Sequence, residues 1–188
     1  TGDQQIGTGA TTSATYSNPF YSAWSNIHTQ HIVRASELLA AGFGPGDINS
    51  VSLNVTSAGT LPMIDLSVKI GTTADASMET FKNNASFQTI FTSSSFLPVV
   101  GANVLNFNSP FNWDGTSNIV LEFCHGNSAS TSTMSRTVTA DNTSYVSSIK
   151  THVSAATAAA TICPNITTNL LTYSVRPTFT FNGQLVCS

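Results

Sequence analysis

The stretch that decides the fold runs from Asn106 to Cys124 and reads NFNSPFNWDGTSNIVLEFC. Its Asp114-Gly115 pair predicts a tight turn, because glycine accepts positive φ and the Asp side chain bonds to nearby backbone. The residues after the turn are mostly β-branched or aromatic and predict a strand. Side chains alternate along a strand, so one face carries Ile119, Leu121 and Phe123, and the other carries Val120, Glu122 and Cys124.

The same alternation recurs along the chain. It is clearest at Ile64–Ile70, where four apolar residues alternate with three polar ones and Gly71 follows. Other candidate strands are 51–55, 87–91, 104–107, 145–153 and 178–181. Short helices are expected at 36–41 and 75–81. Short strands at this spacing predict an all-β fold, a two-sheet β-sandwich of the jelly-roll kind with one or two short helices.

A chain of 188 residues is expected to form one domain. We assign residues 1–182 to a single β-sandwich module. Residues 183–188 run past the last expected strand, so we interpret them as a tail or as the start of a following module.

The composition is poor in charge. Only 8% of residues are charged, against about 25% in ordinary soluble domains, and Ser, Thr and Asn fill the deficit. Such a neutral, hydroxyl-rich surface favours an extracellular or cell-surface location. With six Lys and Arg and a net charge of −3, the chain cannot neutralise a row of phosphates, which excludes nucleic-acid binding. No apolar run approaches the roughly 20 residues of a membrane span, and no motif indicates a cofactor.

The chain contains three cysteines, so one of them remains unpaired if the other two form a disulfide. In an extracellular setting two should pair, and we predict a disulfide between Cys124 and Cys163 with Cys187 unpaired. The alternative is that all are free buried thiols.

No catalytic signature is present. Hydrolysis of a glycoside needs two facing carboxylates. Asp65 and Glu122 both lie on the polar side of an alternating strand, as does Lys69, so the two carboxylates could share a sheet face. An exposed cluster of ion pairs explains them better. We therefore predict no catalytic residues and no enzyme.

Two groups of residues are considered as metal ligands: a pair of histidines and the Asp114 turn. His28 and His31 suit one face of a helix, but their surroundings predict a strand, which would splay them apart. The Asp114-Gly115 turn with Asn118 could offer oxygens to calcium, but one carboxylate is too few, and a plain turn is favoured. We predict no metal site. Arg34 and Glu37 are expected to form a local surface pair.

Aromatic residues are the one feature with binding potential. The segment 16–24 reads YSNPFYSAW, and its proline indicates a loop. Aromatic faces pack against sugar rings while polar neighbours bind hydroxyls. We predict that Tyr16, Tyr21 and Trp24 bind ligand. The alternative is that these rings cover one end of the core, as Trp113 is expected to do.

Five segments, in order, resemble a known family: RASELLAAG at 34–42, the strand 48–55, VKIG at 68–71, FNWDGTSNIV at 111–120 and RPTF at 176–179. The chain resembles, from about Ile6 to Phe181, a β-sandwich module of large Bacteroidetes proteins. These are type IX-secreted surface adhesins and multi-modular polysaccharide-degrading proteins. The resemblance implies a non-catalytic accessory or adhesion module and carries over no binding residues.

Three functions follow as hypotheses. The first is a secreted or cell-surface module for adhesion or carbohydrate binding, with a glycan or neighbouring modules of the same protein as partners. The second is a structural subunit or repeat of a surface filament or layer, self-assembled through strand edges. The third is an accessory domain of a glycan-degrading enzyme, or such an enzyme itself.

Overall fold

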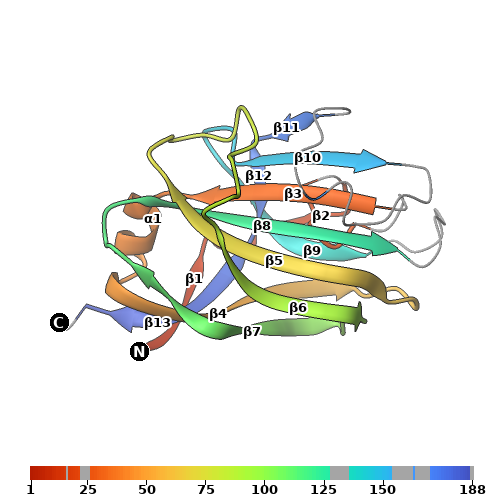
Figure 1. Cartoon of the computed structure of the whole chain (residues 1–188), viewed down its shortest axis with the longest axis horizontal. Coiled ribbons are helices and arrows are strands. Elements are labelled where there is room, and N and C mark those ends of the chain that lie inside the picture. Colours follow the sequence, from red (N-terminus) through yellow and green to blue (C-terminus); the bar gives the residue numbers. More distant parts are fainter. Residues whose placement is uncertain (16, 22–25, 128–135, 154–162, 164–169, 187–188) are drawn as a thin grey trace.

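The computed structural model describes residues 1–15, 17–21, 26–127, 136–153, 163 and 170–186. In these residues two antiparallel sheets pack face to face, which confirms the predicted all-β sandwich (Figure 1). The jelly-roll winding stays a prediction. The described residues hold no helix long and apolar enough to cross a membrane.

The first sheet has seven described strands. Its main path runs β1-β13-β4-β9-β12, while β2 pairs with β9 and β7 pairs with the far side of β4. Their bounds are β1 Gly2–Ile6, β2 Thr11–Ser13, β4 Phe43–Ser57, β7 Gly101–Trp113, β9 Thr137–Asn142, β12 Val175–Pro177 and β13 Phe179–Leu185.

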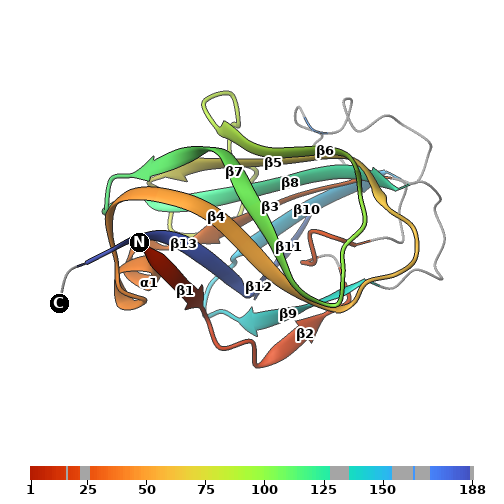
Figure 2. The same ribbon diagram turned by 90° about the horizontal axis from the view of Figure 1, so that it is seen from below.

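The second sheet has six described strands in the order β11-β10-β3-β8-β5-β6. Figure 2 shows it as a separate layer, with β5, β8 and β3 on one side of the sandwich and β4, β13 and β1 on the other. The bounds are β3 Asn26–Val33, β5 Met63–Thr73, β6 Gln88–Phe96, β8 Asn118–Asn127, β10 Ser148–Val153 and β11 Leu171–Tyr173.

The predicted turn at Asp114-Gly115 is present, since Gly115 has φ 82. The strand after it is β8, at the centre of the second sheet. The predicted helix at 36–41 is α1 (Ala35–Ala40), which ends before Gly42 at φ 94. Residues 75–81 form no helix, which corrects that expectation.

The last strand corrects the predicted domain boundary. Strand β13 continues to Leu185, and Leu185 pairs with Phe43 of β4 while Gly183 pairs with Gly2 of β1. Residues 183–185 therefore belong to the sandwich, because they complete the ladder on both sides. Cys187 lies outside the described residues.

The main core fills the space between the sheets. Trp113 is 1% exposed, as predicted for a core residue, and its indole N–H donates to Ser117 O at 2.8 Å. Phe123 of β8 stacks on Phe179 of β13 with ring centroids 6.2 Å apart, which joins the two layers. The buried apolar residues of both sheets form one continuous cluster around these rings.

A second, smaller core lies on the outer face of the second sheet. Ile32, Val120 and Ile149 project there and are covered by Met78, with Phe81 and Phe87 packed against them. The phenyl ring of Phe87 lies so close to Gly71 that an added Cβ would meet it at 2.0 Å. Gly71 itself lies inside β5, because this strand runs on to Thr73. As a result β3 and β8 are buried on both faces.

Candidate functional site

The predicted aromatic binding loop is only partly described. Tyr16 and Trp24 lie outside the described residues, and Tyr21 is half-buried. Phe20, between them, is fully buried, with its ring centroid 5.9 Å from that of Phe96. At least this ring of the loop covers the core, as the alternative held. Ligand binding by Tyr16, Tyr21 and Trp24 stays a prediction.

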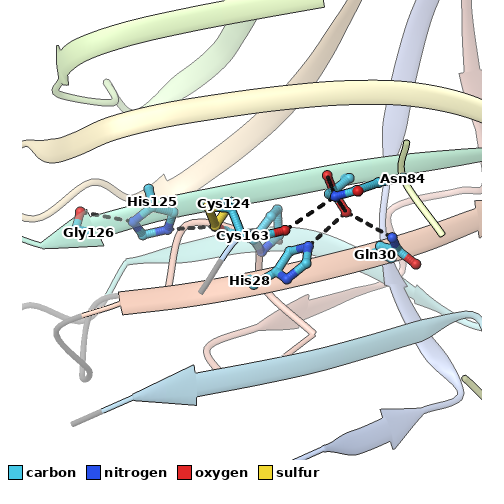
Figure 3. The surroundings of a disulfide bond; sticks show 9 residues. His28, Gln30, Asn84, Cys124, His125, Gly126 and Cys163 are labelled. Carbon is cyan, nitrogen blue, oxygen red and sulfur yellow. Dashed lines mark hydrogen bonds and ion pairs between the residues drawn. A yellow bond between two sulfur atoms is a disulfide. The ribbon is translucent and has the colours of Figure 1, made fainter. Parts of the chain in front are cut away.

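The two cysteines that the sequence pairs are joined in the structure. Cys124 and Cys163 form a disulfide with their Cα atoms 5.8 Å apart. Cys124 lies on the outer face of the second sheet, directly opposite His28 of β3 in the antiparallel register. The disulfide therefore fixes the backbone at Cys163 over the strands that carry His28 and Glu122 (Figure 3).

Glu122 lies beside this disulfide in a buried polar cluster. It is 2% exposed, and its Oε1 atom is 2.8 Å from His28 Nε2 and accepts a 2.8 Å bond from Gln30 Nε2. Asn84 Nδ2 donates to Oε2 at 3.0 Å and to Cys163 O at 3.2 Å. Figure 3 shows His28, Gln30 and Asn84 converging on one point beside the disulfide. The segment that carries Asn84 thus closes over the carboxylate.

The electrostatics of this cluster keep Glu122 ionised. Burial alone would raise the pKa of Glu122, but the hydrogen bonds from His28, Gln30 and Asn84 outweigh burial and hold the pKa below its usual value. The ring of His28 lies 4.7 Å from that of Phe81, and its Nδ1 atom is buried without a hydrogen-bond partner in the described part of the chain.

The expected exposed cluster of Asp65, Lys69 and Glu122 is wrong. Lys69 is the direct cross-strand partner of Glu122, but Glu122 is buried under Asn84. Asp65 sits in a β-bulge of β5 with φ 51 and is exposed to solvent. The bulge breaks the strict alternation on which the prediction of a shared sheet face depended.

The two histidines considered as metal ligands face opposite sides of β3, as the strand prediction implies. His28 faces outward to Glu122, whereas His31 lies between the sheets with its ring centroid 5.7 Å from that of Phe179. Its ring nitrogens contact Ser148 Oγ at 2.7 Å and Thr29 Oγ1 at 2.9 Å. The described residues contain no group of three or more His, Cys, Asp or Glu side chains arranged to hold a metal.

The Asp114 turn is a plain turn. Asp114 Oδ1 accepts bonds from the backbone N–H groups of Thr116 and Ser117 at 2.8 and 2.7 Å. The bond from the Ser117 hydroxyl is the largest cause, and together with these backbone bonds it lowers the pKa of Asp114 to about 2. Asn118 turns away, because its Oδ1 accepts from Ala35 N at 2.8 Å and thereby ties α1 to β8.

The expected side-chain pair between Arg34 and Glu37 is also wrong. Glu37 pairs with Arg176 of β12, with Nη2 2.9 Å from Oε1 and Nη1 2.9 Å from Oε2. Tyr145 donates its hydroxyl proton to Glu37 Oε2 at 2.6 Å. The guanidinium of Arg34 lies over the Tyr145 ring, 3.5 Å from its centroid, and only its backbone N–H bonds to Glu37.

A polar pocket lies beside this ion pair. Its volume is about 360 Å³, and it lies where the turn after β1, the helix α1, the β9–β10 connection and β12 come together. We call it the Arg176 pocket. It is lined by Gly7, Thr8, Glu37, Asp141, Asn142, Thr143, Ser144, Tyr145 and Arg176.

Asp141 is the second carboxylate that lines the Arg176 pocket. Its Oδ1 atom accepts bonds from the backbone N–H groups of Thr8 and Gly9 at 2.9 and 3.0 Å and from the Thr8 hydroxyl at 3.1 Å. Oδ2 accepts from the Thr178 hydroxyl at 2.6 Å. The carboxylate therefore fixes the turn after β1 against β9.

Both carboxylates of the Arg176 pocket are ionised at neutral pH. Burial opposes ionisation of Glu37, but its bonds and proximity to Arg176 hold its pKa below the usual value. The bonds that Thr178 and Thr8 donate to Asp141 likewise outweigh its burial and lower its pKa.

Sequence reasoning missed this pocket because its residues come from four distant segments. In the sequence Arg176 belongs only to the terminal RPTF segment, and Asp141 belongs to no candidate motif. No local signal marks the pocket, because alternation along VRPTFTF places Arg176 on the same side as Thr178 and Thr180, which reads as the polar, exposed side.

Comparisons with known proteins give little further information. No protein-family model and no curated protein matches the sequence. Among solved structures, the chain is similar to the cysteine protease and lectin-like domains of Cwp84, a surface-layer-associated protein of Clostridium difficile. The TM-score is 0.43 at 10% identity, over 83% of this chain and 32% of that one. The chain thus spans about a third of that structure.

Proposed function

We propose that this protein is a non-catalytic extracellular or cell-surface module that binds glycans or mediates adhesion through the Arg176 pocket. The observation that carries the proposal is the state of the charged groups in the pocket. Glu37 and Arg176 are paired with each other, and Asp141 is saturated by hydroxyl and backbone donors. What remains for a ligand is a wall of hydroxyl and amide groups, which suits a hydroxyl-rich ligand.

Two further observations support the proposal. The Cys124–Cys163 disulfide fits an oxidising, extracellular compartment. The lowered pKa values of Glu37, Asp141 and Glu122 leave each of these carboxylates without the proton that a hydrolase would need. The link to type IX secretion in the Bacteroidetes rests on the sequence resemblance alone.

The test is a glycan array with the wild-type chain and two variants. Ser144 is exposed at the rim of the pocket, so Ser144→Trp should fill the pocket and abolish retention of the glycans that bind. Asn108→Trp adds the same ring at an exposed position of β7 outside the pocket and should leave binding unchanged. Equal binding by wild type and Ser144→Trp would remove the Arg176 pocket from the proposal.

The predicted aromatic loop is tested in the same experiment. If Tyr16, Tyr21 and Trp24 bind the glycan, Trp24→Ala should weaken retention and leave the melting temperature nearly unchanged. A large fall in the melting temperature would place Trp24 in the core and end this prediction.

A second candidate function is self-association in a surface filament or layer. The β6–β7 turn exposes Leu97, Val99 and Val100 at 51%, 59% and 69%, and Val104 follows at 53%. Asn103 holds the turn in shape through bonds to the backbone N–H and C=O of Val99 at 2.9 and 2.8 Å. Contiguous exposed apolar side chains favour association. Light scattering should then show oligomers of the wild-type chain, and Val100→Asp should return them to monomers. A wild-type chain that is monomeric at all concentrations would exclude this function.

A further inference from the structure

We propose that the Arg176 pocket selects uncharged glycans and rejects those that carry carboxylate or sulfate groups. The inference rests on the proposed function, because it names the ligand class of the same pocket. It is carried by the charges that line the pocket and by the bonds that already engage them.

Arg176 is the only cation among the described residues that line the pocket; both of its terminal nitrogens bond to protein atoms, whereas its Nε is buried without a hydrogen-bond partner in the described part of the chain. Its Nη1 donates to Ile32 O at 2.8 Å as well as to Glu37 and Tyr145, and its Nη2 donates to Glu37. The whole residue is 1% exposed, so its guanidinium, Nε included, is closed to a ligand. A ligand carboxylate therefore cannot obtain the bidentate contact by which arginine usually binds carboxylates.

The lining carries an excess of negative charge. Glu37 and Asp141 are both ionised and Arg176 offsets one of them, so one negative charge remains on a side chain that is 8% exposed. Arg34 is not part of the lining; its guanidinium lies on the Tyr145 ring and its Nε donates to Ala76 O at 2.8 Å. An anionic ligand inside the pocket would thus approach the charge of Asp141, while the described lining offers no exposed cation to bind it, because Arg176 is buried.

Neutral hydrogen-bonding groups form the rim. Asn142 and Ser144 are exposed there, and the Thr8 hydroxyl, which donates to Asp141, keeps its lone pairs as acceptors. Amides and hydroxyls of this kind bind sugar hydroxyls without any change in charge. The chemistry of the rim and the charge of the walls therefore point to the same ligand class.

The test compares matched pairs of oligosaccharides that differ in charge alone. Isothermal titration of the whole chain is carried out with β-1,4-mannotetraose against β-1,4-mannuronotetraose, and with cellotetraose against its C6-carboxylate form. In any pair that binds, the neutral oligosaccharide should bind at least about tenfold more tightly than its carboxylate counterpart. Its affinity should depend little on the salt concentration. Equal or tighter binding of the carboxylate form would overturn the inference and leave the proposed function standing.

Two variants at one rim position test the cause. Ser144→Lys places a cation beside the pocket and should raise the ratio of carboxylate to neutral affinity several-fold, whereas Ser144→Gln, of similar length and no charge, should not. An unchanged ratio in Ser144→Lys would exclude the electrostatic mechanism. If no oligosaccharide on the array or in the titrations binds at all, the proposed function fails together with the inference.

Discussion

Glu37 and Arg176 form a bidentate ion pair across 139 positions of the chain, with both nitrogen–oxygen distances at 2.9 Å. The pair joins the single described helix to β12, and Tyr145 completes it with a bond to the same carboxylate. The arginine is 2% and the glutamate 28% exposed in their side chains. The pair is therefore shielded from the solvent that weakens surface ion pairs.

Breaking this pair should destabilise the protein strongly. Glu37→Gln leaves the buried Arg176 charge without its partner, and we expect a loss of about 3 kcal/mol in the free energy of unfolding. Arg176→Lys keeps the charge but loses the planar fork, so it should also destabilise. The matched control is Lys82→Gln, which removes a surface pair whose Asp75 side chain is 61% exposed and should cost less than about 1 kcal/mol. Similar losses in all three variants by urea denaturation would contradict this expectation.

Glu122 should matter for stability through its hydrogen bonds. In Glu122→Gln one carboxylate oxygen becomes an NH₂ group that faces the donors of Gln30 and Asn84. We expect a loss of about 2 kcal/mol in unfolding free energy, because buried donors are left unpaired. Glu79→Gln, at an exposed position, serves as the control and should be neutral. A Glu122→Gln protein as stable as wild type would show that the hydrogen bonds of this cluster add nothing to the free energy of unfolding.

The same variant tests the absence of catalysis. The wild-type chain should release no reducing sugar from a panel of plant and algal polysaccharides, since the pKa of Glu122 is lowered and the residue holds no proton to donate near neutral pH. Release by wild type that disappears in Glu122→Gln would overturn the non-enzymatic proposal.

The disulfide should contribute about 4 kcal/mol to stability. Cys124 and Cys163 close a loop with a sequence separation of 39, and chain entropy predicts this magnitude. A Cys124→Ala, Cys163→Ala double variant should show the loss in chemical denaturation, whereas Cys187→Ser should not. Peptide mapping without reductant is the independent check: a peptide that links Cys187 to either partner would reject the assignment.

Stability should fall as the pH drops below about 6.5. Burial, aided by the charge of Arg176, lowers the pKa of His31 to about 3, and burial is the main cause that lowers the pKa of His125 to about 4. Both histidines stay neutral in the folded state while the unfolded chain takes up protons, so their contribution is complete above the unfolded pKa of about 6.5 and is lost toward the folded values. Between pH 7 and 5 we expect a loss on the order of 3 kcal/mol.

Calorimetry at several pH values measures this loss. His31→Asn should reduce the pH dependence by about half, because one of the two buried imidazoles is then absent. The carboxylates with lowered pKa act in a separate range, since their contribution is lost only as the pH falls below about 4.5. A melting temperature that does not change between pH 7 and 5 would contradict the neutral, buried state of both histidines.

The sequence by itself determined the fold class, the Asp114-Gly115 turn, the short helix and the pairing of Cys124 with Cys163. The fold class, the turn and the helix are readable because strand alternation, turn chemistry and helix propensity act between residues that are close in sequence. The pairing of two cysteines 39 positions apart rests instead on the expectation of an oxidising compartment. Strand alternation recurs so often along the chain that a few local errors do not change the predicted fold class.

Only the tertiary structure decided what the polar residues do. Glu122 looked exposed because its strand alternates, yet the segment with Met78 and Asn84 covers the outer face of the second sheet and buries it. Asp65 leaves the expected face because of a bulge. The side chain of Glu37 pairs with Arg176, 139 positions away, and not with the side chain of Arg34, three positions away. The local sequence pattern shows which residues are polar, but the partners of these residues depend on how the two sheets pack. A buried charge has to pair with a group that the tertiary structure places beside it.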